Sequence, residues 1–144
     1  MRLLAAVVLL AASSTFAQDA APVGSAEHVI LVSIDGLRPE FYLDRSWPLP
    51  NVQDMAREGA CAEAVRTVFP SVTYPSHTTL VTGALPSRHG IFFNTPFEPG
   101  GETGRWHWEA SAITAPTLWD ALRAAKRKTA ALSWPVTVGA PIDL

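Results

Sequence analysis

Two side chains in this chain are well suited to chemistry: the carboxylate of Asp35 and the hydroxyl of Thr73. Asp35 follows the apolar run of residues 29–32 and precedes Gly36, which lets the backbone turn sharply beside the carboxylate. A carboxylate so placed offers a hard oxygen ligand for a metal ion. The alternative is an aspartate that only caps the following turn.

Thr73 stands immediately before a predicted helix whose first turn contains Pro75. The unpaired N–H groups and the positive dipole of a helix start favour an anion such as phosphate beside this hydroxyl. A threonine hydroxyl is a weak nucleophile that needs a base or a metal ion. The chain has no G-x-S-x-G turn and no Ser-His-Asp order, so the metal route is favoured. Plain helix capping by Thr73 is the alternative, and Ser71 and Ser76 are alternative nucleophiles.

The pattern of apolar and turn residues predicts an α/β fold with a parallel sheet, in which Asp35 and Thr73 follow successive strands. Active sites in such sheets lie beyond the carboxyl ends of the strands. A long stretch at 86–115 reads as irregular, and Lys126, Arg127 and Lys128 are expected in the last helical turn. The predicted strands are residues 29–32, 62–68 and 129–133, and the predicted helices are residues 50–58, 75–81 and a segment that begins at Pro116.

The first 17 residues have the layout of a secretory signal peptide, with Arg2, an apolar core and a cleavage site after Ala17. Its apolar run of ten residues is too short for a bilayer, which needs about 20. We therefore expect a periplasmic or secreted product with no stable membrane span after cleavage. Residues 18–27 read as a flexible lead-in, and the single cysteine, Cys61, excludes an internal disulfide.

The composition fits a globular protein, with 144 residues, 48% hydrophobic and 17% charged residues, and a net charge of −2. That length allows one ordinary domain. No block of like charge occurs, so no nucleic-acid-binding surface is expected. The segment Arg105-Trp106-His107-Trp108 could suggest stacking on nucleic acid, but packing of a loop on the domain is favoured at this net charge.

Two segments, VILVSIDGLRPEFY at 29–42 and FPSVTYPSHTTLVTGALPSRHGI at 69–91, resemble the nucleotide pyrophosphatase/phosphodiesterase family of the alkaline phosphatase superfamily. The helix at 50–58, Asn94 after the HGI turn, and Trp134-Pro135 resemble further family features. The resemblance runs from about His28 to the last residue. It implies an alkaline-phosphatase-like parallel-sheet fold, of which residues 28–144 are expected to be the N-terminal part, an incomplete domain.

The resemblance also implies a two-zinc hydrolase of nucleotide or other small-molecule phosphodiesters. Asp35 and Thr73 would bind one zinc, and Thr73 would also be the nucleophile that forms a phospho-threonine intermediate. Asn94 would donate a hydrogen bond to a phosphate oxygen, and Tyr74 would stack on the nucleotide base. Cleavage of a phosphodiester or pyrophosphate bond would release a nucleoside monophosphate.

The sequence departs from the family pattern in two respects. Val72 stands where many animal members carry lysine, which leaves the substrate preference open. The family's further Asp and His zinc ligands have no matching motif here: His28 reads as exposed, His77 as packed behind the site, His89 as stabilising a turn and His107 as part of the loop.

Two alternatives stay open at the level of sequence. One is a threonine-nucleophile alkaline phosphatase, a phosphomonoesterase that shares the T-x-P-S-H pattern. The other is a truncated and inactive chain that at most binds phosphate or a nucleotide. A sulfatase is disfavoured, because His77 stands where its C/S-x-P-x-R pattern requires arginine.

Overall fold

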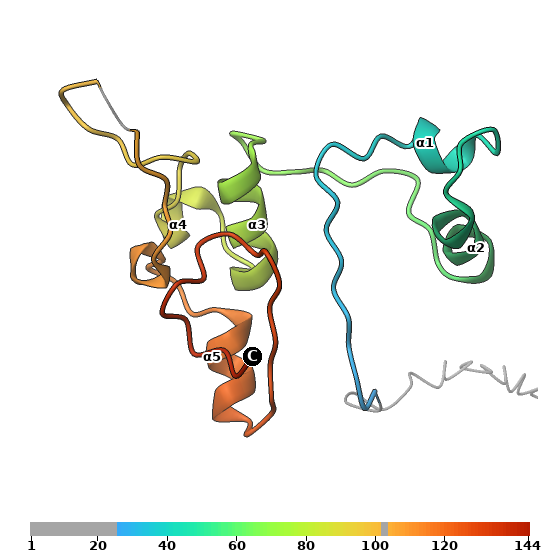
Figure 1. Cartoon of the computed structure of the whole chain (residues 1–144). Coiled ribbons are helices and arrows are strands. Elements are labelled where there is room, and N and C mark those ends of the chain that lie inside the picture. Colours follow the sequence, from blue (N-terminus) through green and yellow to red (C-terminus); the bar gives the residue numbers. More distant parts are fainter. Residues whose placement is uncertain (1–25, 102–103) are drawn as a thin grey trace, which may run out of the picture. The chain divides into compact units, whose positions relative to one another are not determined.

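The computed structural model describes residues 26–101 and 104–144. The predicted signal peptide and residues 18–25 of the lead-in lie outside them. The chain divides into two units, Met1–Ile34 and Asp35–Leu144, and every named helix belongs to the second. No helix among the described residues is long and apolar enough to cross a bilayer. In chain order the helices are α1 (Glu40–Leu43), α2 (Pro50–Glu58), α3 (Thr73–Thr82), α4 (Pro86–His89), the 3-10 helix η1 (Ala110–Ala112) and α5 (Leu118–Ala124) (Figure 1).

Helix α2 has the bounds predicted from the sequence. Pro50 fills its first turn, where a missing N–H costs nothing, and Gly59 ends it with an N–H bond to the Met55 carbonyl at 2.9 Å. The short helix α1, which the pattern did not predict, contacts α2. The rings of Phe41 and Trp47 pack at 4.7 Å beside it.

Helices α3 and α4 follow one another and are in contact. The first begins at Thr73, two residues before the predicted start, and ends at Gly83 with a φ of 64°. The second lies in the stretch predicted to be irregular and ends at Gly90 with a φ of 83°. Glycine adopts this left-handed conformation without a steric penalty, which explains both stops.

Helix α5 begins after Thr117, which forms a capping box with Asp120. The expectation that Lys126, Arg127 and Lys128 lie in its last turn is wrong, because the helix ends at Ala124. Lys126 has a φ of 55°, which cannot continue a helix, and Arg123 is the cation in the last turn.

The predicted parallel sheet is not found among the described residues, where the one recorded β pairing is an isolated parallel bridge between Glu109 and Val138. Residues 29–32 and 62–68 are irregular, and the four apolar side chains at 29–32 are 51–86% exposed. A strand requires a neighbour that satisfies its backbone groups, and an apolar run can predict the strand without supplying that neighbour. Residues 129–131 instead bond to the chain end, through Asp143 N–H to Thr129 O and Ala131 N–H to Leu144 O.

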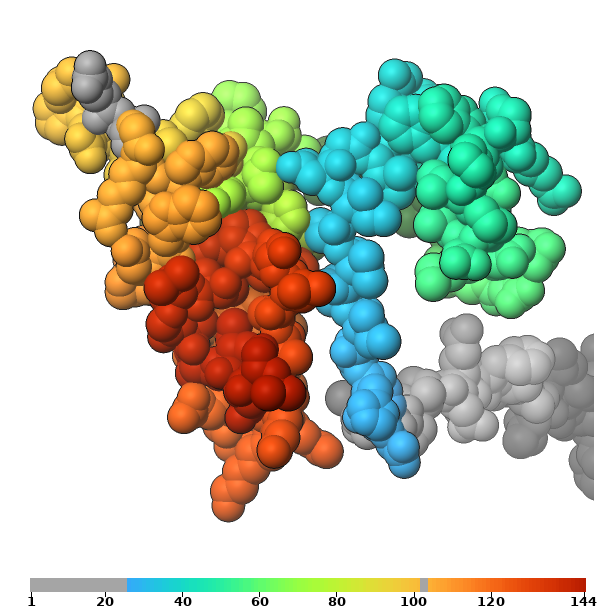
Figure 2. Space-filling view, viewed as in Figure 1, coloured from blue at the N-terminus to red at the C-terminus, as the bar shows by residue number. Residues whose placement is uncertain are grey.

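The core of the second unit forms around the start of α3. Tyr74, Ile91 and Val136 are its buried apolar residues, with Ala112 and Ile113 packed against them. In the space-filling view the residues coloured yellow to red form one continuous mass (Figure 2). The first turn of α3, which carries Thr73, is therefore anchored in the packed part of the chain.

Candidate active site

The hydroxyl of Thr73 donates a hydrogen bond to the carboxylate of Asp35, with 2.8 Å between Oγ1 and Oδ2. The two residues lie 38 positions apart in the sequence, and within the described residues the structure brings them together without the predicted sheet. Thr73 is the first residue of α3, Val72 occupies the N-cap, and no side chain caps the helix start. Thr73 is therefore not the N-cap residue of α3, as the capping alternative would require.

Asn94 is held next to this pair by two hydrogen bonds. Its side-chain Oδ1 accepts the N–H of Tyr74 at 2.9 Å, and its backbone carbonyl accepts the N–H of His107 at 3.2 Å. The N–H of Tyr74 is one of the donors that a helix start leaves without a backbone partner. Since Oδ1 is engaged there, the amide group of Asn94 still has its two N–H donors to offer.

The ring of Tyr74 is buried, with 8% of the residue exposed. Burial raises the pKa of its phenol, so the side chain is neutral at physiological pH. The indole of Trp106 lies against it, at 5.3 Å between ring centroids and 53° between ring planes. The sequence pattern did not reveal this contact, which brings the aromatic loop segment against the residue that follows Thr73.

Neither alternative nucleophile contacts Asp35. The hydroxyl of Ser76 shares a 3.4 Å hydrogen bond with the hydroxyl of Thr67, and Ser71 is exposed. Thr73 is thus the hydroxyl residue of this segment that is paired with the carboxylate.

Two histidines of the segment have structural contacts, as their positions predicted. His77 Nδ1 lies 2.7 Å from the carbonyl oxygen of Thr73, behind the hydroxyl. His89 is fully buried, accepts the N–H of Ile91 at Nδ1 and donates from Nε2 to Thr79 Oγ1. Burial lowers the pKa of His89, which keeps the ring neutral and able to accept at Nδ1.

His28 is exposed, and His107 is half-buried in the loop. Burial also lowers the pKa of His107, with an opposing effect from the charge of Glu109. Within the described residues, no three or more His, Cys, Asp or Glu side chains form a group that could hold a metal ion. Asp35 and Thr73 supply two oxygen donors on their own.

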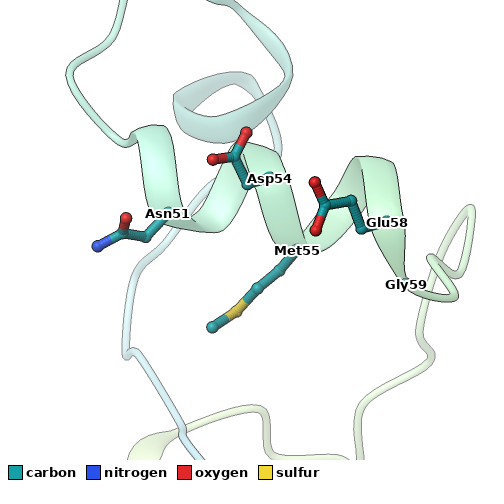
Figure 3. Close-up of a pocket in the computed structure, with 5 residues that line it drawn as sticks. All are labelled: Asn51, Asp54, Met55, Glu58 and Gly59. Carbon is teal, nitrogen blue, oxygen red and sulfur yellow. The ribbon is translucent and has the colours of Figure 1, made fainter.

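A shallow concavity of about 560 Å³ lies on α2 and contains none of the predicted site residues. Figure 3 shows Asp54 and Glu58 along one side of the helix, with Met55 extending away from them. Both carboxylates pair with Arg57, at 2.9 and 2.8 Å. Arg57 therefore offsets one of their two negative charges on the helix surface.

The structure thus places a threonine hydroxyl, bonded to a carboxylate, at the start of a helix. Residues 29–142 match the family model described as type I phosphodiesterase / nucleotide pyrophosphatase. The match covers most of the chain, and the chain belongs to this family, which is part of the alkaline phosphatase superfamily. The resemblance read from the two segments is thereby confirmed.

Curated relatives show similarity over parts of the same region. The bis(5'-adenosyl)-triphosphatase enpp4 of Mus musculus is 31% identical over 121 residues, which is 78% of this chain and 25% of the relative. The ectonucleotide pyrophosphatase/phosphodiesterase family member 3 of Mus musculus is 39% identical over 70 residues, 49% of this chain and 8% of the relative. The pyrophosphatase/phosphodiesterase C725.05c of Schizosaccharomyces pombe is 37% identical over 94 residues, 64% of this chain and 19% of the relative. The chain thus spans a quarter or less of the length of these relatives.

Proposed function

We propose that the protein hydrolyses phosphodiester or pyrophosphate bonds of nucleotides, with Thr73 as the nucleophile. The observation that supports this most is the 2.8 Å hydrogen bond between Thr73 Oγ1 and Asp35 Oδ2. The family and the printed names of its members give the bond class, and the relatives named as adenosyl triphosphatase and nucleotide pyrophosphatases favour a nucleotide substrate.

In the proposed reaction, Thr73 Oγ attacks phosphorus as the bond from phosphorus to the leaving oxygen breaks. The product is a phospho-threonine whose phosphorus still carries the nucleoside, and the leaving group departs as an alcohol or a phosphate together with the proton that Thr73 Oγ gives up. Water then attacks the same phosphorus, the bond to Thr73 Oγ breaks, and a nucleoside monophosphate is released. The hydroxyl of Thr73 is restored and returns to its bond with Asp35.

The residues near Thr73 have proposed roles in the same reaction. The Asn94 amide donates to a phosphate oxygen in this proposal, as in an oxyanion hole, because its Oδ1 is engaged with the Tyr74 N–H and its two N–H donors remain to be used. Tyr74 stacks on the base in this proposal. Its ring is buried against Trp106, so stacking requires that the indole move aside.

The proposed cofactor is zinc, two ions per complete active site. The two oxygens of Asp35 and Thr73 lie 2.8 Å apart and fit adjacent ligand positions on one cation. When bound, zinc would supply Lewis-acid chemistry that lowers the pKa of the threonine hydroxyl. Secretion or export to the periplasm is part of the proposal and rests on the layout of residues 1–17.

The test compares thymidine 5'-nitrophenyl phosphate, a diester, with nitrophenyl phosphate, a monoester, for the wild type and Thr73→Ala. We expect turnover of the diester that depends on added zinc and is lost in Thr73→Ala. Preference for the monoester would favour the phosphatase alternative. Absence of turnover together with binding of phosphate or AMP would favour the inactive fragment, and undiminished turnover in Thr73→Ala would refute the nucleophile.

A further inference from the structure

The imidazole of His77 makes a side-chain contact with the backbone of Thr73, one helical turn earlier. Nδ1 lies 2.7 Å from the Thr73 carbonyl oxygen. A carbonyl oxygen can only accept, so Nδ1 must carry the proton in this contact. The bond adds to the regular N–H to carbonyl bond that an α-helix makes between the same two residues.

Packing against two tryptophans orients this imidazole. The indole of Trp134 meets the His77 ring edge-on, at 5.2 Å and 74°, and it meets the ring of Trp119 on α5 at 6.2 Å and 81°. Trp119 is buried, and α5 contacts α3 (Figure 1). The buried Nε1 of Trp134 has no hydrogen-bond partner in the described part of the chain, so ring packing holds this indole in place.

The start of α3 needs such support because it lacks a capping side chain. Val72 occupies the N-cap, and its apolar side chain makes no capping hydrogen bond. First turns without caps are prone to fray. Two side chains bind this turn: Asn94, from outside the helix, accepts the Tyr74 N–H, and His77, one turn later in α3, binds the Thr73 carbonyl.

We propose that His77 is a positioning residue that holds the first turn of α3, and with it the Thr73 hydroxyl, in register with Asp35. This inference rests on the proposed function for its catalytic consequence. Trp119 packs on Trp134, and Trp134 packs on His77, which orients the imidazole. The imidazole in turn holds the backbone carbonyl of Thr73.

Two amide substitutions separate the bond from the bulk of the ring. In His77→Asn the amide nitrogen can reach the place of Nδ1, whereas in His77→Gln it lies near the place of Nε2. A misplacement of about 1 Å at a reacting group can lower turnover by up to about 100-fold. We therefore expect His77→Gln to lower kcat about tenfold with little change in KM, and His77→Asn to retain most of the activity.

The direct test uses the wild-type chain and the two variants, without substrate. Long-range proton–nitrogen spectra should place a proton on Nδ1 of His77, the nitrogen that faces the Thr73 carbonyl. Hydrogen exchange of the His77 backbone amide, which bonds to the same carbonyl, should be faster in His77→Gln than in His77→Asn or the wild type. The exchange rates of backbone amides in the last turn of α5, measured in the same three proteins, serve as the control for global unfolding.

An imidazole protonated only at Nε2 would overturn the proposal, and so would equal exchange in all three proteins. Equal kcat in wild type and His77→Gln, in an enzyme that Thr73→Ala inactivates, would also overturn it. If Thr73→Ala keeps full turnover, the proposed function fails, while the spectra and the exchange rates still decide whether His77 holds the turn.

Discussion

At the residue scale, the site depends on one contact between distant positions, the bond from Thr73 to Asp35. Asp35 is exposed and Thr73 half-buried, so the pair is accessible while its helix is anchored. A hydrogen bond between accessible groups adds little to stability, because water competes for both partners. We therefore expect the pair to serve mainly to orient the hydroxyl of Thr73. Loss of the Asp35 carboxylate should lower turnover far more than it lowers the free energy of unfolding.

The substitution Asp35→Asn tests whether the carboxylate affects turnover without affecting stability. The variant keeps an oxygen that can accept from Thr73 but loses the negative charge needed to hold a cation. We expect turnover to fall about 100-fold or more, bound zinc to decrease, and the free energy of unfolding to change by less than about 0.5 kcal/mol.

Asp54→Asn is the matched control, since Asp54 is an exposed carboxylate on α2 that pairs with Arg57. It should leave turnover and zinc content unchanged. Steady-state kinetics, metal analysis and urea unfolding measure the three quantities. If turnover falls no further in Asp35→Asn than in Asp54→Asn, the proposed role of Asp35 is contradicted.

At the element scale, the aromatic loop at 104–109 lies against Tyr74, the residue that follows Thr73. The segment at 104–109 is tied to Asn94 through His107 N–H and is bridged by an Arg105–Glu109 ion pair at 2.7 Å. Trp106 is 42% exposed and lies on the ring of Tyr74. A base that stacks on Tyr74 must compete with this indole.

Trp106→Ala should therefore strengthen the binding of AMP. An aromatic pair contributes about 0.5–1.5 kcal/mol, so loss of the competing ring should lower Kd by about twofold to tenfold. Trp108→Ala is the control, because Trp108 is exposed in the same loop and has no recorded ring contact with Tyr74. Titration calorimetry gives both Kd values. Weaker binding in Trp106→Ala would contradict stacking on Tyr74 and would mean that Trp106 itself contacts the nucleoside.

The ends of α3 and α4 provide a test of packing at the same scale. Gly83 and Gly90 both have a positive φ, but a Cβ at Gly83 would meet open space, whereas one at Gly90 would lie 3.3 Å from Thr114 Oγ1. Thr114 Oγ1 donates to the Arg88 carbonyl at 2.8 Å and cannot move freely.

Gly83→Ala should cost about 1–2 kcal/mol from backbone strain alone, and Gly90→Ala should cost more because Thr114 must shift. The excess should disappear when Gly90→Ala is measured in a Thr114→Ala background. Urea unfolding of the five proteins gives the free energies. If Gly83→Ala and Gly90→Ala lower the free energy of unfolding equally in the wild-type background, Thr114 moves away from the added Cβ without a loss of stability.

At the scale of the whole molecule, local signals predicted helices α2, α3 and α5 but missed the short helices α1 and α4, and distant contacts decided the rest. Pro50 and Gly59 fixed the bounds of α2, and Asp35 and Thr73 were identified by residue type and position. The predicted strands depended on partners far along the chain, which apolar runs cannot specify. The same limit applies to the burial of Tyr74 under Trp106 and to the packing of His77 on Trp134.

Buried histidines make the stability of the second unit depend on pH. Burial lowers the pKa of both His89 and His107, so the folded state resists protonation of these rings. The unfolded chain binds those protons near the ordinary pKa of 6.5. Below that pH the unfolded state holds more protons than the folded state, and the free energy of unfolding decreases as pH falls.

Urea unfolding in metal-free buffer should therefore show full stability near pH 7.5 and a progressive loss as the pH falls below 6.5. In His89→Asn an amide oxygen can still accept the Ile91 N–H, and the titrating ring is gone. This variant should start less stable at pH 7.5, because Thr79 loses its partner, but should lose less stability on acidification. His28→Asn, at an exposed position, should follow the wild-type curve. A His89→Asn curve that runs parallel to the wild type would mean that protonation of His89 does not limit acid stability, and the pH dependence would then belong to His107.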